Sequence, residues 1–268
     1  MPRRACPFSI PSARLREPVG QVSRGPHGSG TSLIRPDWRR SMPRILPVPL
    51  GAANAYIVSE GSASILIDAG FPRQGKKFFT ALSKQGMDPS RIALVVITHV
   101  HYDHVGNLRE IRDACRCPVA VPAGEADWLR RGAVVFPAGA HPVGRALIAA
   151  GRLLARVLPG FVRFDPVEAD ILVDGELSLD PFGMAGRIVM TPGHTAGSLS
   201  VLLDDGNAFV GDLAFNVLPC GGGPIMPPFA DDPAALKQSW AALRRLGVRT
   251  VWPGHGRPFS ARRLRSQA

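Results

Sequence analysis

The chain has 268 residues, 45% of them hydrophobic and 20% charged, a balance typical of one globular domain with enough apolar material for a core. No apolar run approaches the length of a membrane span, so none is expected. The net charge of +11 is concentrated at the two ends, because residues 1–41 carry eight arginines against two acidic residues and residues 261–268 carry three arginines. The nearly neutral body disfavours a nucleic-acid partner and favours a small-molecule substrate.

Residues 1–41 are rich in Pro, Gly, Ser and Arg and lack hydrophobic periodicity, so we expect a disordered basic extension. No long apolar stretch follows either of its arginine pairs, which disfavours a twin-arginine signal; a transit peptide is the other targeting alternative. We expect translation to start at Met42 and residues 42–268 to form the folded domain. The sequence leaves open whether that domain is a monomer or a homodimer.

The four cysteines are too few and too irregularly spaced for a disulfide framework, which favours a reducing, cytoplasmic setting. They are Cys6, Cys115, Cys117 and Cys220. Cys115 and Cys117 fall near the end of a helix expected after His104, and we expect them to be core residues, with a second metal site as the alternative. His27 and His141 stand apart from the other histidines and are expected at the surface.

Alternating strands and helices are predicted along the body of the chain. Residues 72–86 have the apolar spacing of a helix, and residues 93–97 have the composition of a buried strand. Residues 232–246 predict a further helix, with Asp232 as its N-cap and Gly247 as its stop. The core-facing residues of that helix are predicted to be Leu236, Trp240 and Leu243.

The segment directly after the predicted strand at 93–97 is unusually rich in metal-binding side chains. It contains His99, His101, Asp103 and His104. Imidazole suits Zn, Cu, Fe and Ni, and a neighbouring carboxylate can serve as a ligand or as a base. The alternative is a polar turn that happens to be rich in histidine. A metal site, unlike such a turn, predicts more ligands downstream.

Three downstream residues meet that expectation. Each follows a short apolar run bounded by Gly or Pro, and the three are His194, Asp212 and His255. Side chains at the same end of neighbouring strands can converge on one point. Five of the seven histidines fall in these strand-end clusters, so we expect a single shared metal site.

These motifs, together with Asp68 in the run Leu66-Ile67-Asp68-Ala69-Gly70, resemble the five ordered motifs of the metallo-β-lactamase superfamily over about residues 46–259. The resemblance implies an α/β fold, a four-layer αββα sandwich with metals at one edge. It also implies the ligand set: His99, His101 and His194 for one metal, Asp103, His104 and His255 for the other, and Asp212 as the bridge. Asp68 is implied to orient a ligand loop from outside the coordination shell.

The expected ions are two Zn²⁺, with Fe or Mn as alternatives. The site stays net positive after two carboxylates and a bridging hydroxide are counted, and such a site lowers the pKa of bound water to about 7. A hydroxide bridging the metals is therefore the expected nucleophile. Asp103 is the candidate catalytic residue that orients it and passes its proton to the leaving group.

We expect this site to hydrolyse a carboxylic ester, lactone or thioester. A bridging Asp212 is a mark of the esterase, thioesterase, lactonase and phosphodiesterase branches and weakens a true β-lactamase assignment. Only 13 residues follow His255, too few for the helical end of glyoxalase II, and the tyrosine typical of quorum-quenching lactonases is missing. The alternatives are a phosphoester or β-lactam hydrolase, or an iron-dependent redox enzyme. A module that has lost catalysis is disfavoured by the complete ligand set.

His194 lies 90 positions after His104, which predicts a helical insertion over about residues 122–165. Within it, residues 144–161 have the period of a helix with leucines on one face and arginines on another. This helix is either an ordinary surface helix or a lid whose apolar face roofs the metals and favours acyl or aromatic substrates. The loop 219–229 is a second candidate for the pocket wall. The leucines are Leu147, Leu154 and Leu158, and the arginines are Arg145, Arg152 and Arg156.

Overall fold

The computed structural model describes residues 42–264, except residues 138, 140–141, 159–161 and 218–222. The predictions made for residues 1–41 therefore lie outside the described part of the chain. The same is true of the predicted surface position of His141 and of the first residues of the loop 219–229.

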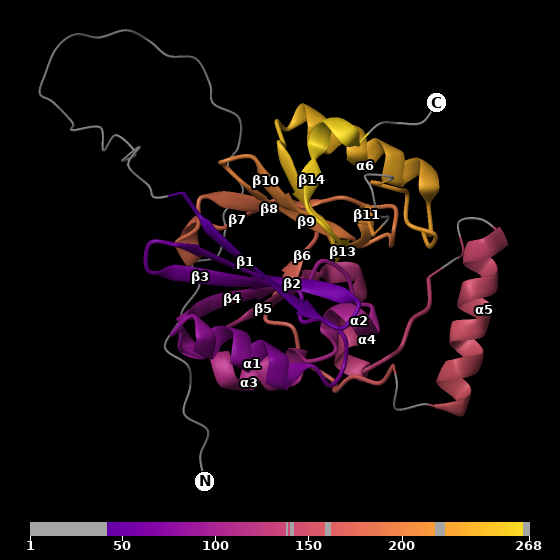
Figure 1. Ribbon diagram of the computed structural model, residues 1–268, viewed down its shortest axis with the longest axis horizontal. Helices are drawn as coiled ribbons and strands as arrows, with labels where there is room; N and C mark the ends of the chain where they lie inside the picture. Colours follow the sequence, from indigo (N-terminus) through magenta and orange to yellow (C-terminus); the bar gives the residue numbers. More distant parts are fainter. Residues whose placement is uncertain (1–41, 138, 140–141, 159–161, 218–222, 265–268) are drawn as a thin grey trace, which may run out of the picture. The chain divides into compact units, whose positions relative to one another are not determined.

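The first sheet contains six strands in sequential order (Figure 1). Its first three strands pair antiparallel and the remaining pairs are parallel. The strand predicted at 93–97 is present as β4, shifted by one residue. In order, the strands are β1 (Arg44–Leu50), β2 (Ala53–Glu60), β3 (Ala63–Ile67), β4 (Ile92–Val96), β5 (Val119–Pro122) and β6 (Ile171–Val173).

The second sheet also contains six strands, in the order β14-β12-β10-β9-β8-β7. Only β10 and β12 pair in parallel, and the other neighbours are antiparallel. A separate pair, β11 (Phe215–Asn216) and β13 (His255–Gly256), is parallel. The second-sheet strands are β7 (Leu177–Ser178), β8 (Gly186–Met190), β9 (Leu199–Leu203), β10 (Asn207–Phe209), β12 (Thr250–Trp252) and β14 (Phe259–Ser260).

The helices predicted at residues 72–86 and 232–246 are confirmed, with narrower ends. The first is α1 (Gly75–Lys84), preceded by residues without helical structure. The second is α6 (Pro233–Arg245), and the Asp232 carboxylate caps it by accepting bonds from the backbone N–H groups of Ala234 and Ala235, both 2.9 Å long. None of the described helices is long and apolar enough to cross a bilayer. The other α-helices are α2 (Tyr102–Val105), α3 (Leu108–Cys115), α4 (Ala126–Arg131) and α5 (Pro142–Val157). Short 3₁₀ turns occupy η1 (Pro89–Arg91), η2 (Ala123–Glu125), η3 (Asp180–Phe182), η4 (Gly211–Leu213) and η6 (Ala261–Arg263).

Three hydrophobic cores show that the layers are helix, sheet, sheet, helix. Successive residues of a strand point to opposite faces, so a strand between two cores is apolar along its whole length. In β2, Ile57 faces the core under α1 and α3, whereas Val58 faces the core between the sheets. In β9, Val201 faces the inter-sheet core and Leu202 faces α6. The four-layer αββα sandwich expected from the sequence is therefore confirmed.

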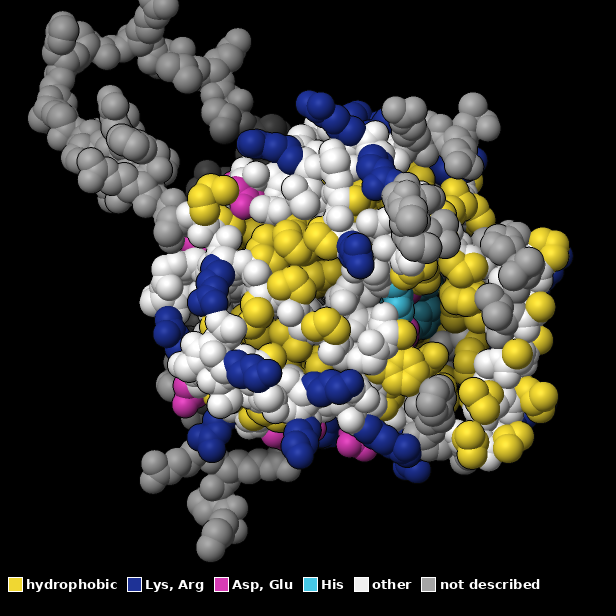
Figure 2. All heavy atoms as spheres, viewed as in Figure 1, with side chains coloured by type: hydrophobic (Ala, Val, Ile, Leu, Met, Phe, Trp, Pro, Cys, Tyr) yellow, Lys and Arg dark blue, Asp and Glu magenta, His cyan; other side chains and the backbone are white. Residues whose placement is uncertain are grey.

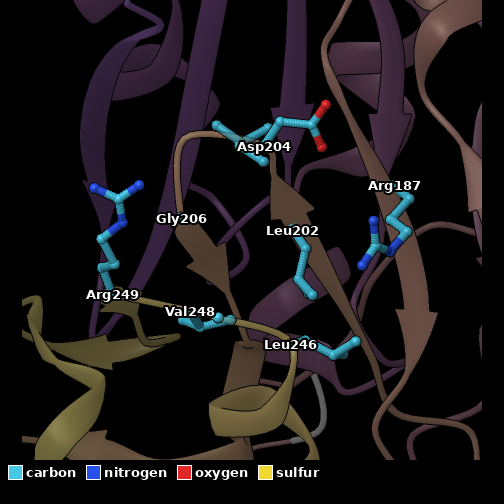
Figure 3. A pocket seen from close by; sticks show the side chains of 9 residues that line it. Arg187, Leu202, Asp204, Gly206, Leu246, Val248 and Arg249 are labelled. Atoms are coloured by element: carbon cyan, nitrogen blue, oxygen red, sulfur yellow. The ribbon is translucent and has the colours of Figure 1, made fainter.

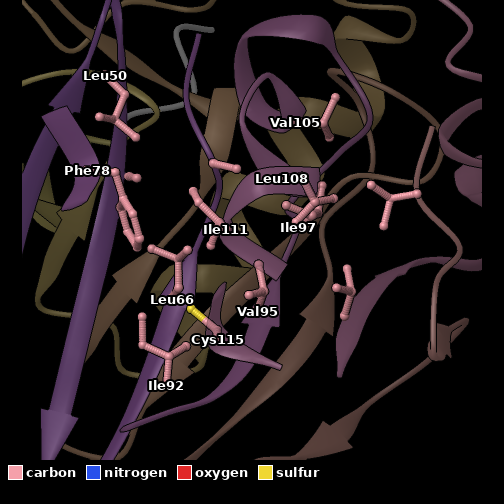
Figure 4. Close-up of a cluster of buried hydrophobic side chains, with 14 of the residues drawn as sticks. Leu50, Leu66, Phe78, Ile92, Val95, Ile97, Val105, Leu108, Ile111 and Cys115 are labelled. Carbon is pink, nitrogen blue, oxygen red and sulfur yellow. The ribbon is translucent and has the colours of Figure 1, made fainter. Parts of the chain in front are cut away.

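The core between the first sheet and its helices also explains Cys115 and Cys117. Figure 4 shows Phe78 of α1 and Leu108 of α3 on either side of Leu66 and Val95, with Cys115 between Leu66 and Ile92 in this view. Both cysteines are buried there as free thiols. Their predicted role as small core residues is confirmed.

Candidate metal centre

All seven predicted ligand residues lie at one edge of the sandwich, where β4, β8, β10 and β12 end. The residues 99–104 follow β4 and enter α2. His194 follows β8, Asp212 lies in η4 directly after β10, and His255 begins β13 after β12. Neighbouring strands that end at the same edge bring these side chains together although up to 156 positions separate them in the sequence.

The seven side chains form two groups of three around one shared carboxylate. The first triad is His99, His101 and His194, and the second triad is Asp103, His104 and His255. Within each triad the potential ligand atoms lie within 4.8 Å of one another. His99 and His104 form a further group of this kind with Asp212, which therefore stands between the triads.

Distances place the Asp212 carboxylate within reach of both triads. Its Oδ1 lies 3.2 Å from His104 Nε2 and 3.4 Å from His255 Nε2, both in the second triad. Its Oδ2 lies 3.7 Å from His194 Nε2 in the first triad. His255 Nε2 is in turn 3.3 Å from Asp103 Oδ2. This arrangement fits a carboxylate shared by two ions.

Buried polar atoms without a hydrogen-bond partner gather at this point. Among the described residues they include the Nε2 atoms of His99, His101 and His104 and the Oδ1 atom of Asp212. A buried nitrogen or oxygen without a partner is costly unless something else satisfies it. Imidazole nitrogens and carboxylate oxygens are donors that suit a divalent transition metal, so the residues present fit such an ion.

Hydrogen bonds on the far side of the rings orient three of the histidines. His104 Nδ1 lies 2.8 Å from Asp68 Oδ2, His194 Nδ1 lies 2.8 Å from the Phe229 carbonyl, and His255 Nδ1 lies 2.9 Å from the Ala52 carbonyl. A ring that donates from Nδ1 presents the lone pair of Nε2 to the centre, as metal-binding histidines commonly do.

Asp68 joins this orienting set from the end of β3. Its Oδ1 accepts a 2.8 Å bond from the backbone N–H of Thr98, and both of its oxygens lie within 3.0 Å of the Thr98 hydroxyl. Asp68 itself has φ +60°, a left-handed conformation that aspartate tolerates better than most residues. The geometry fits the positioning role expected of it from the sequence.

A glycine beside His255 leaves room for the cluster. A Cβ atom at Gly254 would lie 2.5 Å from Asp212 Oδ1 and 2.7 Å from His104 Cε1, which is closer than van der Waals contact allows. The Gly254 N–H also donates to the carbonyl of Gly211 over 2.6 Å, which joins the loops after β12 and β10. Glycine is required here because the backbone itself passes against the cluster.

The first triad stays neutral in the metal-free protein. Burial lowers the pKa of His99 well below its ordinary value, and the neighbouring imidazoles lower it further. Burial and the adjacent His194 lower the pKa of His101 to about 3. Burial also lowers the pKa of His194, although Asp212 opposes it. Three neutral imidazoles are the protonation state that a metal requires.

The second triad has the opposite character. Burial alone would lower the pKa of His255, but the Asp212 and Asp103 carboxylates outweigh it and raise that pKa to about 10. In the same way, Asp212 and Asp68 overcome burial and hold the pKa of His104 well above its ordinary value. The metal-free second triad therefore consists of imidazolium–carboxylate pairs.

Sequence reasoning missed Glu125, which contacts both loops of the first triad. Its buried carboxylate accepts a 2.5 Å bond from the N–H of Val100, between His99 and His101, and another 2.5 Å bond from the Thr195 hydroxyl, next to His194. Burial raises the pKa of this carboxyl, and the two hydrogen bonds oppose that shift. Glu125 follows β5 at the same sheet edge, so the strand-end rule that found the other residues could have found it.

The centre lies at the bottom of a hollow. Figure 2 shows histidine side chains inside it, with apolar side chains along both sides. Phe229, from the predicted wall segment 219–229, contacts the centre through the carbonyl bond to His194. One prediction for residues 144–161 is a lid whose leucine face roofs the metals. Two leucines of that face, Leu154 and Leu158, are 42% and 53% exposed, so the lid stays a prediction.

A second concavity lies at the other edge of the second sheet. Figure 3 shows Arg187 and Arg249 on opposite sides of a pocket of about 240 Å³ at the beginnings of β8 and β12. Arg187 Nε lies 3.5 Å from a Glu176 carboxylate oxygen, and Asp204 adds a negative charge to the lining. The nine residues that line it include no histidine, so this pocket is separate from the metal centre.

Comparisons with known proteins agree with the geometry. The sequence profile of the metallo-β-lactamase superfamily matches residues 48–255. The probable metallo-hydrolase YqgX of Bacillus subtilis is 30% identical over 179 residues, which cover 66% of this chain and 71% of that protein. The probable metallo-hydrolase YflN of the same organism is 27% identical over 229 residues, which cover 80% of this chain and 84% of that protein.

Solved structures agree as well. The crystal structure of BLEG-1 B3 metallo-β-lactamase, 22% identical, covers 82% of this chain and 95% of its own with a TM-score of 0.59, a likeness of fold. The structure of TTHA1623 in a di-iron-bound form is 27% identical and covers 81% of this chain and 94% of its own, with a TM-score of 0.54. The chain belongs to the metallo-β-lactamase superfamily, and its clustered histidines and aspartates can bind a divalent metal.

Proposed function

We propose that this protein is a dinuclear zinc hydrolase that cleaves a carboxylic ester, lactone or thioester. The observation that carries the proposal is the Asp212 carboxylate, whose two oxygens lie within 3.7 Å of nitrogens from both triads. A mononuclear site needs only one such triad. The names of two bacterial relatives, both probable metallo-hydrolases, support the hydrolase class.

The residues divide the work of binding as follows. The first triad offers three neutral nitrogens to one ion, and the second triad offers two nitrogens and the Asp103 carboxylate to the other. When bound, divalent metals supply Lewis acidity, which lowers the pKa of coordinated water to about 7 and polarises a substrate carbonyl. Asp68 and Glu125 hold the ligand loops in position through their hydrogen bonds to Thr98, Val100 and Thr195.

Asp103 is the proposed proton carrier. Its side chain is 15% exposed, whereas that of Asp212 is 5% exposed, so Asp103 is the more accessible of the two carboxylates from the hollow. His255 Nε2, 3.3 Å away, orients one Asp103 oxygen, which leaves the other to hold a proton and pass it to a leaving group.

A panel of substrates tests this function. Lactones, thioesters, aryl esters, phosphotriesters and β-lactams are assayed alongside elemental analysis of the purified protein, with His101→Ala as the inactive control. We expect about two zinc ions per chain and turnover of an ester, lactone or thioester that His101→Ala abolishes. Preferred turnover of a phosphoester or a β-lactam would replace the proposed bond type.

An iron-dependent redox activity is the second candidate, favoured by the di-iron form of the TTHA1623 structure. The same elemental analysis separates the two. Two irons per chain, with oxygen consumption in place of hydrolysis, would reject the zinc hydrolase. Imidazole nitrogens bind both zinc and iron, so the histidines of the first triad do not distinguish the two metals. The elemental analysis decides between them.

A further inference from the structure

Helix α5 packs against the rest of the protein through a narrow stripe of mostly small residues. Gly144 is buried, and Ile148, Gly151 and Ala155 are half-buried at the helical spacing i, i+4, i+7, i+11. A Cβ at Gly144 would lie 2.1 Å from the Pro228 carbonyl oxygen, so the helix begins in direct backbone contact with the loop beside the metal centre. This narrow stripe of contact leaves most of the helix surface in solvent.

Large apolar side chains in the last two turns of α5 point the other way. Leu153 and Val157 lie opposite the packed stripe and are 61% and 68% exposed; Leu154, on the flank of the helix, and Leu158, directly after its end, are also exposed. These four are half of the eight large hydrophobic side chains that are exposed among the described residues. An ordinary surface helix buries its large apolar residues, so this helix is turned outward.

Arginines border this outer face. Arg145, Arg152 and Arg156 follow one flank of α5 at helical spacing, and all three are exposed. Residues 128–164 contain six arginines and no acidic residue, and two of the six, Arg130 and Arg131, pair with Asp127. The sequence from 142 to 158 has no acidic residue at all. The outer surface of α5 is therefore apolar and cationic together.

We propose that α5 docks the protein on an anionic lipid bilayer. In this arrangement Leu153 and Val157 enter the boundary between headgroups and acyl chains, and the arginine flank contacts lipid phosphates. A helix with apolar residues on one face and arginines on the next is the pattern of an interfacial helix. The cytoplasmic leaflet of membranes is rich in anionic lipids that attract such segments.

Charge disfavours two other partners for the outer face of α5, namely a second copy of the helix and residues 1–41. Two copies of α5 packed through Leu153 and Val157 would bring arginine flanks together without an acidic residue to neutralise them. Residues 1–41, with eight arginines and two acidic residues, would add further positive charge. A roof over the metal centre cannot use Leu153 and Val157 either, because they lie on the side of α5 away from its contact with the body.

Docking through α5 would bring the hollow close to the bilayer. Figure 2 shows apolar side chains over α5 on the same face of the molecule as the hollow that holds the histidines. Backbone pairing also links the two regions, because Gly139 forms an antiparallel β-bridge with Phe229, whose carbonyl lies 2.8 Å from His194 Nδ1. A substrate with an acyl chain could therefore reach the centre from the lipid surface.

Vesicle co-sedimentation of the full-length protein tests the proposal. The vesicles contain either equal parts of phosphatidylcholine and phosphatidylglycerol or phosphatidylcholine alone. We expect at least about tenfold stronger partitioning onto the anionic vesicles. Leu153→Ser/Val157→Ser should weaken it by at least about tenfold. Arg152→Gln and Arg156→Gln should each weaken it roughly fivefold and reduce its sensitivity to salt.

Leu172→Ser is the matched control, because Leu172 is 58% exposed but lies on β6. It should partition like the wild type. Every variant keeps residues 1–41, so any binding by that basic segment is common to all. The proposal is wrong if the wild type ignores anionic vesicles or if Leu153→Ser/Val157→Ser still binds them fully. It is also wrong if ultracentrifugation shows a dimer that the same double variant dissociates.

Discussion

The histidines of the two triads of the metal centre lie in opposite electrostatic surroundings. In the first triad, burial lowers the pKa of every histidine, and the pKa of His101 falls to about 3. In the second triad, carboxylates raise the pKa of both histidines, that of His255 to about 10. The first triad is thus ready for a cation, whereas the second must first release protons.

This difference shows how the metal-free protein tolerates so many polar groups in its interior. A buried imidazolium–carboxylate pair satisfies its own charges, and a buried neutral imidazole avoids charge altogether. Orphaned nitrogens at the centre occur at His99 and His101 in the first triad and at His104 in the second. We expect metal binding to be most favourable at the first triad, and three predictions examine this.

The largest effect is expected for Asp103→Asn, which tests whether this residue of the second triad acts in the reaction itself and not only in metal binding. Asp103→Asn should lower kcat by about 10²–10⁴-fold, because an amide cannot hold and transfer the proton. Metal held by the first triad should remain, which elemental analysis of the same sample measures. Asp127→Asn is the control, since Asp127 is a surface carboxylate paired with Arg130. Full turnover by Asp103→Asn with normal metal content would remove Asp103 from the mechanism.

The second prediction concerns pH. Below pH 10 the metal-free His255 is protonated, so metal binding there releases a proton and should tighten as pH rises, by up to about tenfold per pH unit. The first triad should show almost no such slope near neutrality, because His101 is already neutral above about pH 3. Chelator competition with His101→Ala and His255→Ala isolates the two triads. Equal slopes for the two variants would contradict the comparison.

The smallest effect is expected at Glu125, which contacts only the loops of the first triad. Glu125→Ala should weaken metal binding by the first triad by about 10–100-fold, because Val100 N–H and the Thr195 hydroxyl lose their acceptor. Glu125→Gln should retain most of the affinity, since its carbonyl oxygen can accept from Val100 while the hydroxyl accepts from its amide. A comparable loss from the second triad would show that Glu125 acts on the whole fold.

The helix predictions show which signals the sequence carries well. The pattern of Asp232, Pro233 and Gly247 located α6 within a residue or two, because capping and chain termination are local properties. The strand before His99, predicted at residues 93–97, was located equally well, because β4 spans Ile92–Val96. Local sequence could not show that Leu153 and Val157 face solvent, since the same apolar period fits a buried face or an exposed one.

The sequence by itself determined the fold family, the identity of the clustered histidines and aspartates, and the strands that carry them, because buried strands and metal ligands leave periodic and compositional marks. Only the tertiary structure decided that Glu125 joins the loops of the first triad and that Leu153 and Leu154 of α5 face solvent. The physical reason is that distances, burial and the pairing of charges depend on segments far apart in the chain.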